Sequence, residues 1–403
     1  MIRFLTAGES HGKALVAIVE GFPSNIAIAK KYVDYQLKRR QAGYGRSSRM
    51  KIESDSVQIL SGIRFGKTLG SPISFLIENK EWVNWQDLMD TEESQKSKIK
   101  ITIPRPGHAD LVGVTKYNFN DIRNSIERSS ARETAARVAA GSVARKFLEE
   151  FGISVGSFVE SIGGIYSSTN FLSQLVRNGI LAKKSGEGIS LKADKSSVRV
   201  LDQIQEKKII GKIKSAMKAG DTLGGTFIVV ATGVPAGLGS FMQYDRKLDA
   251  DISFNLMSVN AVKAVEIGDG FRNAEQFGSK VQDEIVLNQN NFSRKTNHAG
   301  GIEGGVSNGF PIIVRSAMKP ISTLSKPISS IDLNSMKKVF SRYERSDFTA
   351  VPSCAVIAES MLAWVIAKHF LFKFGGDSVE EAKDNFSSFT KKSFNRIGKG
   401  FRK

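Results

Sequence analysis

The chain has 403 residues, 41% of them hydrophobic, which is enough to bury a large core in one domain or two. It carries 58 Lys and Arg against 40 Asp and Glu, a formal net charge of +18. Because no run of about 18 apolar residues occurs, no membrane span is expected. The N-terminal stretch turns polar too early for a signal peptide. The single cysteine, Cys354, excludes an internal disulfide and is predicted to be a buried core residue, so we expect a cytoplasmic protein.

The positive charge is compatible with two classes of partner, nucleic acid or a multiply anionic small molecule. Lysines gather in the final segment, KKSFNRIGKGFRK, which is typical of a solvated tail. Several arginines instead occur singly among Gly, Ser and Ala residues, namely Arg46, Arg105, Arg128, Arg132 and Arg345. Arginine in such surroundings favours bidentate binding of phosphate and carboxylate groups in a pocket. We therefore predict a small-molecule site and no nucleic-acid partner.

The first third of the chain is predicted to alternate strands with one helix. A short strand leads into GESHG, and a basic loop rich in Gly and Ser follows the helix. The predicted strands are 14–20, 57–60 and 73–77, the predicted helix is 28–41, and 81–100 is predicted to be a polar loop containing some helix.

The stretch 104–148 is predicted to form the floor of a site. Ser130 and Glu133 have the spacing of a capping box at the start of a helix rich in Ala, Gly and Ser, which suits close packing. Arg128, Ser129 and Ser130 would place a cation and two hydroxyls at the positive end of that helix, a favourable position for a phosphate. Upstream, RPGHAD sets Arg105, His108 and Asp110 around a turn.

The remaining elements suggest one catalytic domain, 1–375, followed by a basic tail, 376–403. Strands are predicted at 153–162 and in GTFIVVAT, and helices at 249–262 and 353–374. The charged segment 167–212 carries no motif with evident chemistry and is predicted to be an accessory insertion.

The chain also contains an internal echo. Gly62-Ile63, Gly66, Gly70 and Pro72-Ile73 recur with identical spacing as Gly301-Ile302, Gly305, Gly309 and Pro311-Ile312. An earlier strand in each half ends in Gly-x-Pro, at Gly21 and Gly233. The hypothesis is two similar halves, each with an antiparallel sheet and a small-residue helix; coincidental turn chemistry is the alternative.

Three segments combine a titratable group with turn-forming residues: GESHG (8–12), RPGHAD (105–110) and RSDFTAVP (345–352). Of the four histidines, His11 and His108 lie in Gly-rich turns, which favours acid–base roles, whereas His369 is predicted to be structural or at the surface. No Cys/His ligand spacing supports a metal site. Because G-x-G-x-x-G is absent, any nucleotide or flavin would be held without the dinucleotide fingerprint.

Together with RSSARETAARVAAG, GVPAGLG, NHAGGIEGG, KPIST and RSDFTAVPSCAVIAE, these motifs closely resemble the chorismate synthase family from the N-terminus to about Glu359. The resemblance implies an α+β fold, a sandwich of two antiparallel sheets around central helices, in which the internal echo would be a pseudo-two-fold similarity. It implies a homotetramer. It also implies a lyase that converts 5-enolpyruvylshikimate 3-phosphate to chorismate by anti 1,4-elimination of phosphate, using reduced FMN without net redox change.

The resemblance also implies which residues form the site. Substrate-binding residues would be Arg40, Arg46, Arg105, Arg132 and Arg345, although Arg40 and Arg46 also match positions associated with NADP. His11, assisted by Ser10, would protonate or stabilise the departing phosphate. His108 would act near the flavin, and Asp347 would help to remove the C6 hydrogen. From the residues alone, a turn or N-cap residue before the last helix is the preferred interpretation of Asp347.

Flavin contacts are implied for Arg128, Ser129, Ser130, Asn260, Ala261, Gly305, Lys319, Pro320, Ile321, Ser322, Thr323 and Arg345. Where some family members have a run of glycines, this chain has Ser125-Ile126-Glu127. Because Glu127 adds a negative charge near anionic ligands, its side chain is expected to point away from them. Whether NADPH serves as the reductant of the flavin stays open.

Overall fold

Two antiparallel sheets contain the long strands of this computed structural model, which describes residues 2–47, 54–92, 100–178, 185–288, 291–342, 344 and 346–399. The first sheet has the order β1-β2-β7-β4, and the second has the order β11-β16-β10-β8-β9. Their bounds are β1 (Arg3–Ala7), β2 (Ala14–Glu20), β4 (Val57–Ser61), β7 (Ile73–Glu78), β8 (Ser154–Ile162), β9 (Ile165–Tyr166), β10 (Gly225–Thr232), β11 (Val262–Ile267) and β16 (Ile312–Met318). The predicted strands at 14–20, 57–60, 73–77, 153–162 and in GTFIVVAT are thus confirmed.

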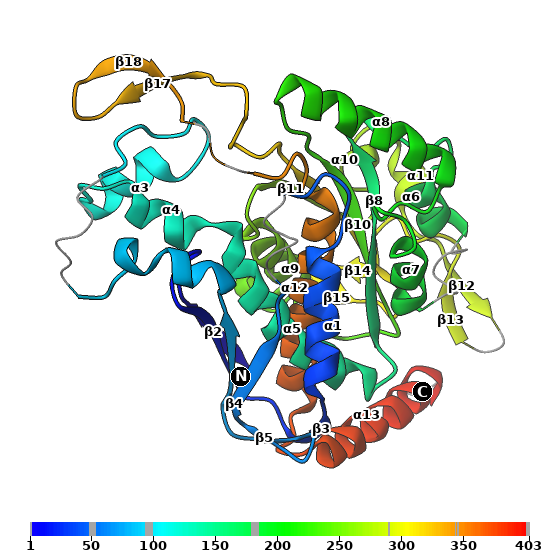
Figure 1. Ribbon diagram of the computed structural model, residues 1–403. Coiled ribbons are helices and arrows are strands. Elements are labelled where there is room, and N and C mark those ends of the chain that lie inside the picture. Colours follow the sequence, from blue (N-terminus) through cyan, green and yellow to red (C-terminus); the bar gives the residue numbers. More distant parts are fainter. Residues whose placement is uncertain are drawn as a thin grey trace.

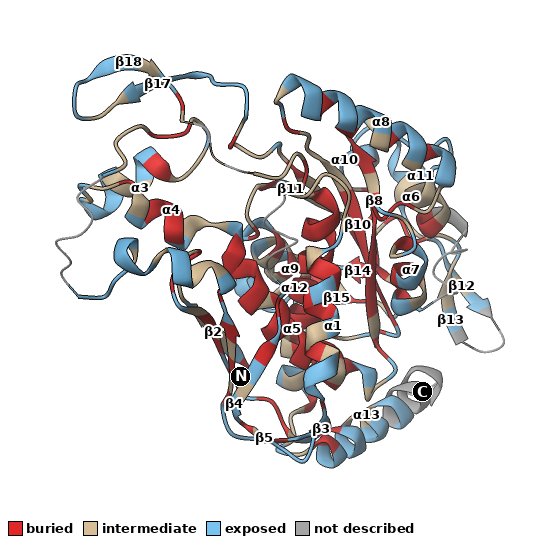
Figure 2. Ribbon diagram, in the orientation of Figure 1, coloured by how far each residue is buried: buried red, intermediate tan, exposed pale blue. Residues whose placement is uncertain are grey.

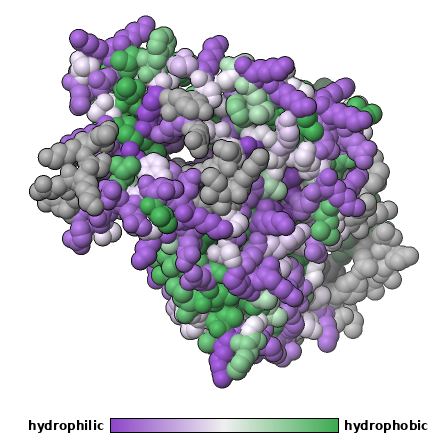
Figure 3. Space-filling view, in the orientation of Figure 1, coloured by the Kyte–Doolittle hydropathy of each residue, from purple (hydrophilic) through white to green (hydrophobic). Residues whose placement is uncertain are grey.

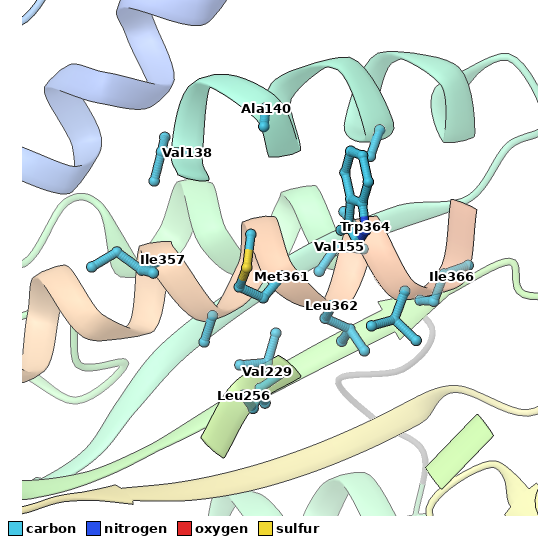
Figure 4. Packing of buried hydrophobic residues seen from close by; sticks show 14 of the residues in the cluster. Val138, Ala140, Val155, Val229, Leu256, Ile357, Met361, Leu362, Trp364 and Ile366 are labelled. Atoms are coloured by element: carbon cyan, nitrogen blue, oxygen red, sulfur yellow. The ribbon is translucent and has the colours of Figure 1, made fainter. Parts of the chain in front are cut away.

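Three helices form the middle of the molecule: α1 (Lys30–Gln41), α5 (Thr134–Glu149) and α12 (Val351–Phe374). Figure 1 shows them between the strands of the two sheets. Helix α5 contacts β2 and β7 of the first sheet, α12 contacts β8 and β10 of the second, and the two helices pack on each other. Figure 4 shows the seam, with Val138 and Ala140 of α5 above Met361 and Leu362 of α12. The deep burial of α5 and α12 in Figure 2 follows from this central position.

Helix α12 is apolar all round. Over its best 18-residue window it meets the length and hydropathy of a membrane span, although no unbroken run of apolar residues produces it. In the protein 83% of that window is buried. A helix that is hydrophobic on every face is also what a large soluble core requires when sheets and helices pack against it from several sides.

The start of α5 differs from the predicted capping box. A short 3₁₀ turn, η3 (Ala131–Glu133), precedes the helix, and the Ser130 hydroxyl accepts a hydrogen bond from the Arg132 N–H. Glu133 does not return to the cap; its carboxylate accepts from the Thr6 hydroxyl and from Arg137. A tertiary partner, Thr6, and an i,i+4 partner, Arg137, have therefore replaced one half of the capping box.

The segment 167–212 supplies part of the core. Its elements are α6 (Phe171–Ser173), the π-helical turn η4 (Gln174–Asn178), α7 (Gly186–Ala193) and the first half of α8 (Gln203–Ala219). Leu175, Val176 and Ile189 pack on Phe158 and Ile228 of the second sheet, on the face opposite α12. The first sheet exposes Leu5, Ile18 and Leu60 to solvent. Figure 3 shows a hydrophobic patch on the side of the molecule where this sheet lies in Figure 1.

Shorter elements connect this framework. They are β3 (Ser24–Ala27), β5 (Ile63–Arg64), β6 (Lys67–Leu69), η1 (Lys80–Asn84), η2 (Gln86–Leu88), α3 (Asp110–Tyr117), α4 (Arg123–Ser129), η5 (Tyr244–Arg246), α9 (Leu248–Met257), α10 (Gly270–Asn273), α11 (Gly278–Val281), β12 (Ile285–Asn288), β13 (Asn291–Arg294), β14 (Ile302–Glu303), β15 (Val306–Ser307), β17 (Ser329–Asp332), β18 (Lys337–Phe340) and α13 (Val379–Lys399). The helix predicted at 249–262 ends at Met257, because the chain turns at Ala261 and enters β11. The basic tail begins as α13, whose Phe386 packs on Phe370 and Phe374 of α12.

The internal echo coincides with matching local structure. Short hairpins, β5–β6 and β14–β15, follow Gly62 and Gly301, whose φ angles are 79° and 81°. Gly66 and Gly305, at φ 74° and 83°, occupy the two hairpin turns. The two sheets also share a strand order. In the first sheet, the strands that come first, second, third and fourth in the chain (β1, β2, β4 and β7) lie side by side in the order first, second, fourth, third. The strands β8, β10, β11 and β16 of the second sheet follow the same order.

Candidate active site

A cavity of about 820 Å³ opens where α5 begins, between the end of α1 and the turn that enters α12. Most of the site residues expected from the sequence line it. They are Ser10, His11, Arg40, Arg46, Arg105, His108, Ser129, Ser130, Arg132, Asn260, Ala261, Lys319, Ile321, Ser322, Thr323 and Asp347. Segments separated by more than 300 residues thus converge on one hollow.

Arg40 and Arg132 form a buried cationic wall. Both contact Asp55, Arg40 at 3.3 Å, and Arg132 also donates from Nε to the Asn79 amide oxygen at 2.9 Å. Arg40 is further fixed by Thr134 and the Ala131 carbonyl at the start of α5. Burial, together with the neighbouring charges of Arg132 and Arg46, lowers the pKa of Arg40 to about 10, so it remains a cation at neutral pH. The wall therefore places two guanidinium groups side by side at the cavity.

An ion pair between Arg46 and Asp347 joins the loop that follows α1 to the segment that enters α12. Arg46 Nη1 lies 3.0 Å from Asp347 Oδ2, and Asp347 Oδ1 accepts the Ser47 N–H at 2.6 Å. The backbone supports this pair, because the Phe348 N–H donates to the Gly45 carbonyl. The segment 167–212 contributes as well, since the Tyr44 N–H donates to the Ser197 carbonyl. The pair therefore depends on a framework that includes the predicted insertion.

The RPGHAD turn forms a compact ionic cluster. Asp110 accepts from Arg105 Nε and Nη2, both at 2.9 Å, and lies 2.5 Å from His108 Nδ1. Burial alone would raise the pKa of Asp110, but the hydrogen bonds from His108 and Arg105 outweigh it and lower the pKa well below its usual range. Arg105 also donates to Thr323 and Glu344. Its guanidinium is thus largely engaged within the protein wall, while His108 remains at the cavity.

His11 is held from two sides. Its Nδ1 lies 2.9 Å from Glu127 Oε1, and its backbone N–H donates to Glu127 Oε2 at 2.8 Å. The imidazole stacks on Trp85 with a centroid distance of 3.9 Å. The prediction that the Glu127 side chain points away is therefore wrong: the carboxylate lies at the cavity because the N–H groups of His11 satisfy it there. The turn that brings His11 to this place needs a glycine, since Gly8 has φ 102° and a Cβ there would meet the Ala14 carbonyl.

Hydroxyls and a lysine line the remaining wall. The Ser130 hydroxyl lies 3.2 Å from that of Ser10, and Asn260 donates from Nδ2 to the Ser129 carbonyl. Among the described residues, the buried Asn260 Oδ1 has no hydrogen-bond partner. On the opposite wall, Lys319 Nζ and the Ser322 hydroxyl both donate to the Gly107 carbonyl.

Four residues expected at the site are not among those found at the cavity. Arg128 is exposed and donates to the carbonyls of Thr6 and Gly8. Gly305 lies at the β14–β15 turn, where a Cβ would collide with Lys247. Pro320 does not line the cavity although its neighbours do. Arg345 lies outside the described residues.

Sequence reasoning missed several residues at the cavity. Glu127, Trp85, Arg123 and Lys263 line it, and Asp55 supports it from behind. Asp55 and Trp85 belong to no motif, so nothing local in the sequence indicates that they lie at the cavity. For Glu127 the sequence offered one signal, a negative charge directly before the RSSA segment. Cys354 is buried as predicted and also lines the cavity, and burial raises the pKa of its thiol to about 12.

Comparison with known proteins places this site in a family. A family model described as chorismate synthase matches residues 2–371. The chorismate synthases of Chloroherpeton thalassium and Chlorobaculum tepidum are 52% and 51% identical to this chain, covering 97% and 96% of it and 100% and 98% of their own lengths. A crystal structure of chorismate synthase is 40% identical, with a TM-score of 0.76, and the match covers 96% of this chain and 97% of that one. The chain belongs to the chorismate synthase family, whose members are lyases that eliminate phosphate from 5-enolpyruvylshikimate 3-phosphate to form chorismate.

Proposed function

We propose that the 820 Å³ cavity is where this elimination occurs and that it binds the substrate together with reduced FMN. The observation that carries the proposal is the convergence of Arg40, Arg46 and Arg132 with two histidines, each bonded to a carboxylate, around one hollow. A substrate with two carboxylates and a phosphate needs paired cations to leave water. Ligand sites typically measure about 300–1,000 Å³, and this volume lies in the upper part of that range.

The cations are proposed to hold the substrate by its anionic groups. Arg40 and Arg132 present a rigid wall because Asp55 and Asn79 restrict their side chains. Arg46 faces the same cavity from the loop that follows α1. Arg105 is assigned to the site mainly as the residue that orients His108, and Arg345 is assigned through its motif alone. NADP remains an alternative ligand of Arg40 and Arg46.

His11 is proposed to protonate the departing phosphate. With Nδ1 beside Glu127, the other ring nitrogen, Nε2, is the one that can give a proton to a phosphate oxygen as the C–O bond breaks. Ser10 lies on the same wall and would donate a hydrogen bond to the same group.

His108 is proposed to act near the cofactor and Asp347 at C6 of the substrate, whereas His11 acts at the departing phosphate. Asp110 orients His108, whose exposed edge would hold or release a proton near the cofactor. Asp347 is held in place by Arg46 and the Ser47 N–H, and it is proposed to assist loss of the C6 proton.

The residues present fit a flavin phosphate. Ser129 and Ser130 lie just before the buried helix α5, Asn260 Oδ1 is a buried acceptor in need of a donor, and Lys319 with Ser322 and Thr323 offers a cation and hydroxyls. Ala261 and Ile321 would contact the ring, while Arg128, Gly305 and Pro320 belong to the proposal through their motifs alone. Reduced FMN, when bound, supplies electron density for the elimination without net redox change, and NADPH is a possible source of its electrons.

The organisation of the protein completes the proposal. Residues 1–375 would form one catalytic domain that includes the insertion 167–212, with 376–403 appended, and the two sheets would form a sandwich with pseudo-two-fold symmetry around the helices. The shared strand order and the paired hairpins support the symmetry. Superposition of residues 1–149 on 150–374 tests it. We also propose a cytoplasmic homotetramer, which light scattering on the purified protein would test.

Anaerobic turnover with photoreduced FMN tests the function, with phosphate and chorismate measured together. A parallel assay in air, with and without NADPH, identifies the source of electrons. His11→Ala and Asp347→Ala should each lose most of the turnover with reduced FMN supplied. Full turnover of either variant would remove that residue from the mechanism.

A further inference from the structure

We propose that Glu127 is a positioning residue that keeps a proton on Nδ1 of His11, so that Nε2 alone exchanges a proton with the ligand. The inference deepens the function proposed for His11 and rests on it. No local motif suggests this role, since residue 127 precedes the RSSA segment and is distant from His11 in sequence.

Glu127 contacts the GESHG turn through three of its atoms, the two carboxylate oxygens and the backbone carbonyl oxygen. Its carboxylate accepts the His11 backbone N–H at 2.8 Å and faces His11 Nδ1 at 2.9 and 3.1 Å. Its backbone carbonyl accepts the Ser10 N–H at 3.0 Å. A carboxylate accepts hydrogen bonds, and these contacts are made through N–H groups, so the geometry selects the tautomer of neutral His11 with hydrogen on Nδ1.

Because Glu127 is buried, its need for a hydrogen-bond donor strongly favours the tautomer with hydrogen on Nδ1. The Glu127 side chain is 2% exposed, so its charge is shielded from water and needs protein donors. Among the described residues, two charged groups, Arg123 and Glu81, lie next to the His11–Glu127 pair. Glu127 itself and Arg123 lie on α4, with Arg123 Nη1 4.0 Å from Glu127 Oε1, and Glu81 of η1 lies 3.9 Å from His11 Nε2. Arg123 is too distant to satisfy the Glu127 carboxylate, which leaves His11 as its main donor.

Trp85 fixes the plane of the ring. The indole stacks on the imidazole at an interplanar angle of 20°, and the Arg123 guanidinium lies 5.3 Å from the indole centroid. A flip of the ring about the Cβ–Cγ bond would keep the stacking on Trp85 but would take Nδ1 away from Glu127, and intermediate angles would break both contacts. The nitrogen left to meet a ligand is Nε2.

The consequence is a defined direction of proton transfer. As an acid, His11 carries hydrogen on both nitrogens. It gives the Nε2 proton to the phosphate oxygen, and it keeps the hydrogen on Nδ1, which continues to donate to Glu127. The neutral ring that remains is the tautomer that Glu127 stabilises. The same nitrogen can then be reprotonated without rotation of the ring.

The direct test is ¹⁵N NMR on the full-length protein with labelled histidine, with the His11 signals assigned by their loss in His11→Ala. At a pH where His11 is neutral, the wild-type protein should show hydrogen on Nδ1 and an unprotonated Nε2. In Glu127→Gln the amide can also donate to Nδ1, so a mixture of the two tautomers is expected. Glu81→Gln is the matched control, because it removes an equal charge near Nε2 and should leave the tautomer unchanged. Hydrogen on Nε2 in the wild type, or a Glu127→Gln spectrum like that of the wild type, would overturn the inference.

Kinetics give a second readout that a purely structural role would not move. In Glu127→Gln kcat should fall while the KM for the substrate changes less, since Nε2 would carry out the proton transfer from only one of the two tautomers. Circular dichroism and thermal unfolding would show that the variant is folded. If His11→Ala retained full turnover, the function proposed for His11 would fail, whereas the tautomer measurement would still decide the role of Glu127.

Discussion

Gly141 of α5 lies directly against Ser360 of α12. A Cβ placed on Gly141 would be 2.5 Å from the Ser360 Cβ and 2.9 Å from its carbonyl oxygen. The missing side chain is what allows the two central helices to pack so closely, and the N-terminal end of α5 forms one wall of the cavity. Helix packing and site geometry are therefore connected through this contact.

Gly141→Ala should lower the free energy of unfolding by about 1–3 kcal/mol, because the core is already filled and the helices must separate to accept a methyl group. Chemical denaturation measures the change. Gly211→Ala on the exposed face of α8 is the matched control: nothing lies within 4 Å of a Cβ there, so it should stabilise the protein slightly. Equal effects at the two glycines would contradict the packing argument.

Glu359 in the middle of α12 should be essential for stability. Its buried carboxylate accepts from Arg39, Arg145 and Arg199, as well as from Ser157 and Ser190 of the second sheet and α7. Glu359→Gln would leave three buried guanidinium groups without their shared anion, a loss of about 3–5 kcal/mol. Glu284→Gln, in an exposed pair with Lys295, should change the unfolding free energy by less than about 1 kcal/mol.

The same residue predicts a pH dependence. Although burial by itself would raise the pKa of Glu359, the three arginines lower it well below its usual range in the folded protein. Its contribution to stability is thus complete above the unfolded-state pKa of about 4.3 and is lost as pH falls toward the folded-state pKa. Unfolding free energies measured from pH 6 to pH 3 should fall more steeply for the wild type than for Glu359→Gln. Parallel curves would show that the carboxylate is not paired in this way.

Asp347→Asn should separate chemistry from binding. The amide keeps the size of the side chain and can still accept the Ser47 N–H, but it cannot act as a base or pair with the Arg46 charge. We expect kcat to fall about 100-fold or more while the KM for the substrate changes less. Steady-state kinetics with reduced FMN measure both constants. A rise in KM with unchanged kcat would assign Asp347 to binding alone.

Arg132→Lys should weaken substrate binding although the charge is kept. Lysine cannot contact Asp55 and Asn79 and also present a planar fork to the cavity. The KM for the substrate should rise about 10- to 100-fold, corresponding to the loss of one hydrogen bond to a charged group. Arg64→Lys, in the exposed strand end of β5 and not among the residues that line the cavity, is the control and should leave KM unchanged. An unchanged KM in Arg132→Lys would mean that charge alone is recognised.

Patterns of hydrophobic residues and turn residues predicted much of the framework. The strands β2, β4, β7, β8 and β10 and the helices α1, α5 and α12 appear where periodicity placed them. Boundaries failed where tertiary contacts compete with local rules. Glu133 turns toward Thr6 and Arg137 instead of capping α5, and the helix expected to continue to residue 262 stops at Met257.

The motifs by themselves predicted which residues would gather at the cavity: the arginines, the two histidines and the hydroxyl turns are recognisable because each lies in a short, unusual segment. Only the tertiary structure decided their pairing. Asp55 between Arg40 and Arg132, Glu127 on His11, and Arg105 on Thr323 all follow from contacts between segments that are separated in the sequence. The physical reason is that a buried charge takes whichever partner the fold brings within hydrogen-bond distance, and sequence spacing does not specify that distance.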